Sequence, residues 1–355
     1  MKAKFLLAGL TAVVLSASLV ACGGKGDEKK ADGAAKTSGL SGAGSTFIAP
    51  LFQKWSSEYN KTSGVAINYQ SVGSGAGVDQ IKKKTVDFGA SDEPMKPEQL
   101  AENKMVQFPT AVGGVVPVYH IEGIAKGVVF SGPVLGDIYL GKIKKWNDPA
   151  LVKLNPSVKL PDAEIKVVRR SDGSGTTYLW TEYLSKVNEG WAGKAHKSPN
   201  WIEGTVGGKG NEGVAANVKQ FANSIGYVEY IYAKKNDMTY GSIVNKAGKV
   251  VAPSDESFTE AAATADWTVP GMAASLTNAP GEKAWPIAGT AFVIMHLQPE
   301  NPQNSAQILK FFDWALTSGQ PVAKELNYIP LPESVVAIIK GKMKEIKDAS
   351  GQSIL

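Results

Sequence analysis

The sequence predicts an α/β protein with mainly parallel sheets, in which strand–turn–helix units follow one another along the chain. Short segments in which apolar residues alternate with period two are followed by segments with helical apolar spacing. Glycine accounts for 38 of the 355 residues, which indicates many tight turns and close backbone approaches. With 43% hydrophobic and 20% charged residues, the chain is typical of a globular protein of about two domains.

The first part of the folded body alternates between helices and strands. Apolar residues at helical spacing predict a helix over 48–59, where Pro50 is tolerated in the first turn. Period-two alternation predicts a strand over 65–69. The further elements expected here are a short helix around 78–81, a strand over 87–90, and strand-like runs over 105–121 broken by Pro109 and Gly113-Gly114.

The second part repeats this pattern. A strand over 165–170 leads through Gly173-Ser174-Gly175 into a helix over 180–187. The other elements expected are a helix over 135–139, a helix over 214–221 after a glycine loop, strands over 225–230 and 290–296, and a late helix over 308–315.

The N-terminus has the parts of a secretory signal peptide over residues 1–21: a basic start, a short apolar run and small residues. The apolar run of about 16 residues is shorter than the roughly 20 residues of a membrane span. Leu19-Val20-Ala21-Cys22 resembles the bacterial lipobox, which predicts Cys22 as an acylated first residue of the mature protein. The alternative is a buried cysteine in an ordinary signal peptide. The polar, glycine-rich residues 22–40 predict a flexible tether.

Composition argues against several classes of protein. The formal net charge is +5, and removal of Lys2 and Lys4 with the signal leaves about +3, which does not suggest a nucleic-acid binder. One cysteine excludes an internal disulfide framework, and the scattered His120, His196 and His296 do not suggest a metal centre. We therefore expect no metal and no cofactor.

Three turns that precede helices combine Ser or Thr with glycine, at 44–47, 73–77 and 172–177. A helix N-terminus carries unpaired N–H groups and partial positive charge, and glycine lets a ligand approach the backbone. With a hydroxyl as a further donor, this combination binds oxyanions. The alternative for any single turn is that the hydroxyl only caps the helix. Three such turns together favour an oxyanion site.

An arginine pair precedes the third turn. Strand alternation sends Arg169 and Arg170 to opposite faces, so only one is expected to reach the site, where Asp172 is placed to hold it. The end of a strand is where ligands bind in α/β proteins.

Two other motifs are candidate sites. Gly208 to Gly213 matches G-x-G-x-x-G, but no clear strand leads into it, and we interpret it as a glycine loop. Ser174 lacks the G-x-S-x-G context of a serine hydrolase.

Several segments together resemble the phosphate-binding protein of bacterial high-affinity phosphate ABC transporters, a type II-like periplasmic binding protein. They are 42–47, 86–92, 136–143, 168–176, 225–230 and 311–315. The resemblance implies two α/β lobes joined by two crossing segments, with phosphate enclosed between them. By similarity, lobe 1 comprises residues 41–111 and 281–355, and lobe 2 comprises residues 112–280.

The resemblance also implies a set of phosphate ligands. They are the hydroxyl of Thr46, the backbone N–H of Phe47, the hydroxyl of Ser74, the carboxylate of Asp92, the guanidinium of Arg170 oriented by Asp172, and the hydroxyls and N–H groups of Ser174, Gly175 and Thr176. A carboxylate in an anion site is tolerable if the ligand brings a proton to share, as phosphate does near neutral pH and sulfate does not. The alternative is that Asp92 caps a helix that begins near Pro94.

The sequence thus predicts a non-catalytic receptor that captures inorganic phosphate by lobe closure and presents it to the permease of an ABC transporter. We expect it to be exported to the periplasm or cell surface, lipid-anchored to a membrane and monomeric. Two alternatives stay open: a secreted phosphoester hydrolase with a phosphate pocket, and a surface lipoprotein that holds a partner protein.

Overall fold

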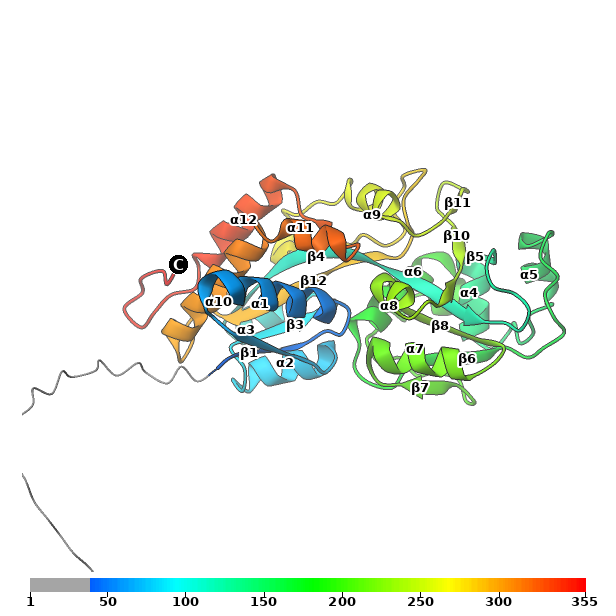
Figure 1. Cartoon of the computed structure of the whole chain (residues 1–355), viewed down its shortest axis with the longest axis horizontal. Helices are drawn as coiled ribbons and strands as arrows, with labels where there is room; N and C mark the ends of the chain where they lie inside the picture. Colours follow the sequence, from blue (N-terminus) through cyan, green and yellow to red (C-terminus); the bar gives the residue numbers. More distant parts are fainter. Residues whose placement is uncertain (1–38) are drawn as a thin grey trace, which may run out of the picture. The chain divides into compact units, whose positions relative to one another are not determined.

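The computed structural model describes residues 39–355 (Figure 1). The predicted signal peptide, Cys22 and the tether up to residue 38 lie outside the described residues. Leu40, which we expected to end the tether, instead begins the first strand and is buried. Among residues 39–355, no helix has both the length and the apolar character that crossing a membrane requires.

The described chain is a mixed α/β body, as predicted. Its strands are β1 (Leu40–Gly44), β2 (Ile67–Ser71), β3 (Phe88–Ser91), β4 (Met105–His120), β5 (Val129–Ser131), β6 (Lys166–Arg170), β7 (Val206–Gly208), β8 (Ser224–Glu229), β9 (Thr239–Tyr240), β10 (Ser242–Val244), β11 (Val250–Val251), β12 (Ala288–His296) and β13 (Ile329–Pro330). Its α-helices are α1 (Ala49–Ser63), α2 (Ser74–Lys82), α3 (Pro97–Glu102), α4 (Gly132–Tyr139), α5 (Pro149–Leu154), α6 (Gly175–Val187), α7 (Gly210–Gln220), α8 (Tyr230–Lys235), α9 (Asp255–Ala262), α10 (Pro302–Ala315), α11 (Gln320–Glu325) and α12 (Glu333–Met343).

One large sheet contains most of the strands, in the order β2-β1-β3-β12-β4-β8-β6-β7 (Figure 1). At one end β1 pairs in parallel with β2 and β3, and at the other end β6 pairs in parallel with β7 and β8. Between them β12 and β4 run antiparallel to their neighbours. The strand–turn–helix pattern predicts the parallel ends but not these antiparallel crossing strands.

The strand β4 joins the two ends of the sheet. It pairs with β12 up to Gly114 and with β8 from Val115 onward. Our expectation of separate runs broken by Pro109 and Gly113-Gly114 is wrong, because β4 is continuous. Pro109 lies where the register with β12 shifts, a place where its missing N–H is tolerated. A Cβ at Gly114 would lie 2.2 Å from the Phe258 ring, so this glycine serves close packing and not a turn.

Two further boundaries differ from the prediction. The expected strand over 225–230 ends at Glu229, and Tyr230 begins α8. A short strand, β7, leads into α7, whereas we expected no strand before the glycine loop. Only three residues long, β7 shows too little alternation to be recognised in the sequence.

Aromatic side chains pack the two ends of the sheet. Near β1–β3, the Phe312 ring of α10 lies 5.1 Å from that of Phe88 and 5.5 Å from that of Phe52. Near β6–β8, Trp180 of α6 stacks on Tyr227 of β8 at 4.8 Å. The Tyr227 hydroxyl lies 2.7 Å from the Thr177 hydroxyl, so this packing also holds the turn that begins α6.

Two helical glycines form a matched test of this packing. A Cβ at Gly77 in α2 would lie 2.4 Å from Gly44 Cα and 2.6 Å from the Ala43 carbonyl oxygen, whereas one at Gly341 in α12 meets nothing within 4 Å. We expect Gly77→Ala to lower the free energy of unfolding by about 1–3 kcal/mol through overpacking. We expect Gly341→Ala to raise it by about 0.5–1 kcal/mol through helix propensity. Urea denaturation measures both, and a Gly77→Ala variant as stable as the parent protein would contradict the packing described here.

Candidate functional site

The three hydroxyl-rich turns meet in the folded chain, although they are far apart in sequence. The Gly175 N–H donates to Ser74 Oγ at 3.1 Å, and the Gly75 N–H donates to the Gly173 carbonyl at 2.9 Å. Asn211 donates hydrogen bonds to the hydroxyls of both Thr46 and Thr176. All the predicted phosphate ligands are buried: Thr46, Phe47, Ser74, Asp92, Arg170, Ser174, Gly175 and Thr176.

Helix capping accounts for only one of the three turns. The residues at the N-cap positions of α1 and α2, Ile48 and Gly73, make no side-chain cap. Ser174 does cap α6, because its Oγ accepts the Thr177 N–H at 3.0 Å. The capping alternative therefore holds for Ser174 and fails for Thr46 and Ser74.

Asp92 follows β3 and is 1% exposed. Ser45 Oγ donates to its Oδ1, and Ser74 Oγ lies 3.5 Å from its Oδ2. The alternative that Asp92 caps a helix is wrong, since α3 begins after Lys96. Burial raises the pKa of Asp92 to about 7, although the Ser45 hydrogen bond, the charge of Arg170 and the Ser74 hydrogen bond act in the opposite direction.

Arg170 and Asp172 form a two-pronged ion pair at the start of the third turn. Nε donates to Oδ1 at 2.8 Å and Nη2 to Oδ2 at 2.6 Å, while Nη1 lies 3.4 Å from Thr176 Oγ1. Burial alone would raise the pKa of Asp172, but the hydrogen bonds and charge of Arg170 outweigh it and lower that pKa below its usual value. Arg169 points elsewhere, with its Nε 3.2 Å from Thr205 Oγ1, as strand alternation predicts.

The sequence analysis missed several residues of this site. Ser45 links the first turn to Asp92 and also accepts the Phe47 N–H at 3.0 Å, so that N–H is already engaged in this structure. Tyr232 Oη donates to the Thr46 carbonyl at 2.7 Å, and Tyr328 Oη donates to the Phe47 carbonyl. Asn211 lies in the Gly208–Gly213 motif that we interpreted only as a loop, and this motif was the one signal that could have pointed to it.

Comparison with known proteins identifies the family. Residues 29–318 match a family described as a PBP superfamily domain. The chain is 50% identical over 321 residues to the phosphate-binding protein PstS of Pasteurella multocida, covering 89% of this chain and 93% of that protein. It is 50% identical over 314 residues to PstS of Haemophilus influenzae, covering 87% of this chain and 94% of that protein. The chain belongs to this family of phosphate-binding proteins.

Solved structures agree at the level of the fold. A periplasmic phosphate-binding protein, PfluDING, solved with phosphate, has a TM-score of 0.67 at 19% identity and covers 85% of this chain and 93% of its own. The phosphate-binding protein of Stenotrophomonas maltophilia has a TM-score of 0.63 at 17% identity, with coverage of 85% and 93%. The chain therefore has the two-lobed α/β fold that the family resemblance implies.

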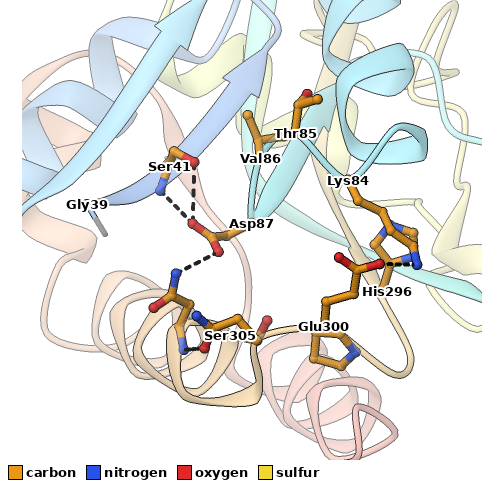
Figure 2. Close-up of a pocket in the computed structure, with 12 residues that line it drawn as sticks. Gly39, Ser41, Lys84, Thr85, Val86, Asp87, His296, Glu300 and Ser305 are labelled. Atoms are coloured by element: carbon orange, nitrogen blue, oxygen red, sulfur yellow. Dashed lines mark hydrogen bonds and ion pairs between the residues drawn. The ribbon is translucent and has the colours of Figure 1, made fainter. Parts of the chain in front are cut away.

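A separate cavity of about 230 Å³ lies away from the three turns, beside the start of α10 (Figure 2). Its charged groups are already paired: Asp87 accepts the Ser41 N–H at 2.8 Å and Asn304 Nδ2 at 3.1 Å, and Lys84 lies 2.6 Å from Glu300. None of the predicted phosphate ligands lines this cavity.

Within residues 39–355, no group of three or more His, Cys, Asp or Glu side chains is placed to hold a metal ion. The converging turns therefore remain the candidate site of this family member.

The raised pKa of Asp92 gives a test that needs no ligand. The pKa of Asp92 is 3.8 in the unfolded chain and about 7 in the folded protein, so the folded protein holds the proton more tightly. Its contribution to the free energy of unfolding is therefore highest below pH 4 and is lost as the pH rises through 7. We expect Asp92→Asn to be more stable than the parent in phosphate-free buffer at pH 8, by on the order of 2–4 kcal/mol, and by less than half of that margin at pH 5.

The measurement is urea denaturation at several pH values between 5 and 8. Asp162→Asn is the control: Lys145 holds the pKa of this exposed carboxyl below 3.8, so its titration lies outside that pH range. Glu229 is also buried with a raised pKa, so part of the pH dependence remains in both variants. If the free energy of unfolding of Asp92→Asn equalled that of the parent at every pH, ionisation of the buried Asp92 carboxyl would not destabilise the folded protein.

Proposed function

We propose that this protein binds inorganic phosphate between its two lobes and delivers it to the permease of an ABC transporter for import. The observation that carries the proposal is the meeting of three hydroxyl–glycine turns around the buried Arg170 guanidinium and the Asp92 carboxyl. Such a site offers a desolvated oxyanion many fixed donors in place of water. The curated relatives at 50% identity are named phosphate-binding proteins, which supports the same ligand for this chain.

Each predicted ligand has a role in this proposal. The hydroxyls of Thr46, Ser74, Ser174 and Thr176 donate to phosphate oxygens, as do the N–H groups of Phe47 and of the first turn of α6 at Gly175. In this structure the Phe47 N–H donates to Ser45 Oγ, the Gly175 N–H to Ser74 Oγ and the Ser74 hydroxyl to Asp92. In the proposal these three donors turn to phosphate oxygens when the ligand binds. Arg170, oriented by Asp172, contacts the ligand through the guanidinium edge that faces Thr176.

We propose lobe boundaries close to residues 112 and 280. The transfer of β4 from β12 to β8 between Gly114 and Val115 supports the first of these. In this division, Ser74 and Asp92 belong to lobe 1 and Gly175 to lobe 2, so the hydrogen bond from the Gly175 N–H to Ser74 Oγ bridges the two lobes.

Asp92 supplies discrimination between anions in this proposal. Phosphate carries a proton near neutral pH that the carboxylate accepts, whereas fully ionised sulfate meets an unpaired buried negative charge. We expect calorimetry at pH 8 to show one tight phosphate site and negligible sulfate binding. We expect Asp92→Asn to reduce the preference for phosphate over sulfate at least about tenfold, because an amide also donates to sulfate. Equal affinity of the parent protein for the two anions would refute this role.

We further propose that phosphate is bound and released unchanged. When the parent protein is incubated with a chromogenic phosphate ester, we expect it to release no more product than the Ser174→Ala variant releases. Turnover that depends on Ser174 would favour the hydrolase alternative instead.

We also propose that the protein is exported and held at a membrane by lipid on Cys22, as a monomer. Intact-mass measurement of the mature protein is expected to show a chain that begins at Cys22 and carries acyl groups. A mature chain without them would overturn the anchor but not the binding function.

A further inference from the structure

Asn211 lies completely buried in the first turn of α7, between the first and third hydroxyl-rich turns. Its Nδ2 donates to Thr46 Oγ1 at 2.7 Å and to Thr176 Oγ1 at 3.2 Å. Its backbone N–H also donates to Thr46 Oγ1, at 3.1 Å. Its Oδ1 accepts the Glu229 N–H at 2.9 Å.

The last of these bonds determines which way the amide of Asn211 faces. A backbone N–H can only donate, so the atom beside it must be the amide oxygen. The NH₂ group is then directed to the two threonines. Gly210 supports the turn, since its N–H donates to Asp172 Oδ1 at 3.1 Å and its φ of 69° suits glycine.

The consequence follows from the capacity of a hydroxyl, which has one hydrogen to donate and two lone pairs. Thr46 Oγ1 accepts two hydrogen bonds from Asn211, so both of its lone pairs are used. Thr176 Oγ1 accepts one from Asn211 and one from Arg170 Nη1. Each hydroxyl is left with only its hydrogen to offer to a ligand.

We propose that Asn211 is a positioning residue of the phosphate site, which makes the hydroxyls of Thr46 and Thr176 obligate donors. The inference rests on the proposed function. A ligand oxygen at either threonine must then accept the hydroxyl hydrogen, and the ligand cannot donate its own proton to either threonine oxygen. The proton of bound phosphate is therefore directed toward Asp92, which is the carboxyl available to share it.

A double-mutant cycle tests this inference. We expect Asn211→Ala to weaken phosphate binding about tenfold or more in the parent protein, because it removes donors that act on a charged ligand through the hydroxyls. In a Thr46→Val background, where one hydroxyl is absent, the same change is expected to cost several-fold less, and the same holds for Thr176→Val. Calorimetry gives the affinities, and urea denaturation in phosphate-free buffer shows that each variant folds.

Asn217→Ala is the matched control. Asn217 lies in the same helix, is only half-buried, and donates through its side-chain amide to the Gly207 carbonyl. The phosphate affinity of Asn217→Ala is therefore expected to stay within about twofold of the parent. If Asn211→Ala does not fold, Asn211→Ser keeps a polar group in the buried space and enters the same cycle.

The outcomes separate this inference from the proposed function. A parent protein that binds no phosphate would defeat the function. If the parent binds phosphate, two results would overturn the role of Asn211 alone. One is a negligible loss of phosphate affinity in Asn211→Ala. The other is a loss that is as large in both threonine variants as in the parent, because a merely structural residue acts independently of the hydroxyls.

Discussion

Burial of the Asp92 carboxyl is the constraint on which the arrangement of the site depends. Removing a carboxylate from water costs several kcal/mol unless polar groups compensate for the lost solvation. Here Ser45 and Ser74 donate to its two oxygens, and the charge of Arg170 acts from the opposite turn. Burial still prevails and raises the pKa of Asp92 to about 7. The site therefore carries a group that is poised to share a proton.

A second buried acid connects this site to the crossing strands. Glu229 is the last residue of β8 and the N-cap of α8, and its Oε2 accepts the Ile231 N–H at 2.8 Å. Burial raises its pKa well above the usual value, and the charge of Asp92 acts in the same direction. Its backbone N–H holds the amide of Asn211, and Tyr328 Oη lies 3.3 Å from its carboxylate. The end of β8 and the residues that orient the hydroxyls are therefore parts of one hydrogen-bonded network.

The sequence revealed those features of the site that have a local cause. Glycine beside Ser or Thr at the start of a helix is a local pattern, and strand alternation predicted that only one of Arg169 and Arg170 reaches the site, whereas the choice of Arg170 came from the family resemblance. Asn211 was missed because its partner Thr46 lies 165 residues away, and no periodicity records such a contact. Gly114 looked like a strand breaker for the related reason that its close neighbour, Phe258, is distant in sequence. The fold class was predictable from short-range patterns, whereas the continuity of β4 depended on long-range packing.

The glycines of the facing turns show why these turns approach one another so closely. Gly75, Gly173 and Gly175 are absent from the residues with positive φ, so backbone conformation does not require glycine at these positions. Space does: a Cβ at Gly75 would lie 3.1 Å from Gly173 Cα, and one at Gly175 would lie 2.4 Å from Asp92 Oδ2. Any side chain there would hold the two turns apart and admit water beside Asp92. Because polar interactions gain strength where water is excluded, the lack of side chains at these positions supports the proposed anion site alongside its hydrogen-bond donors.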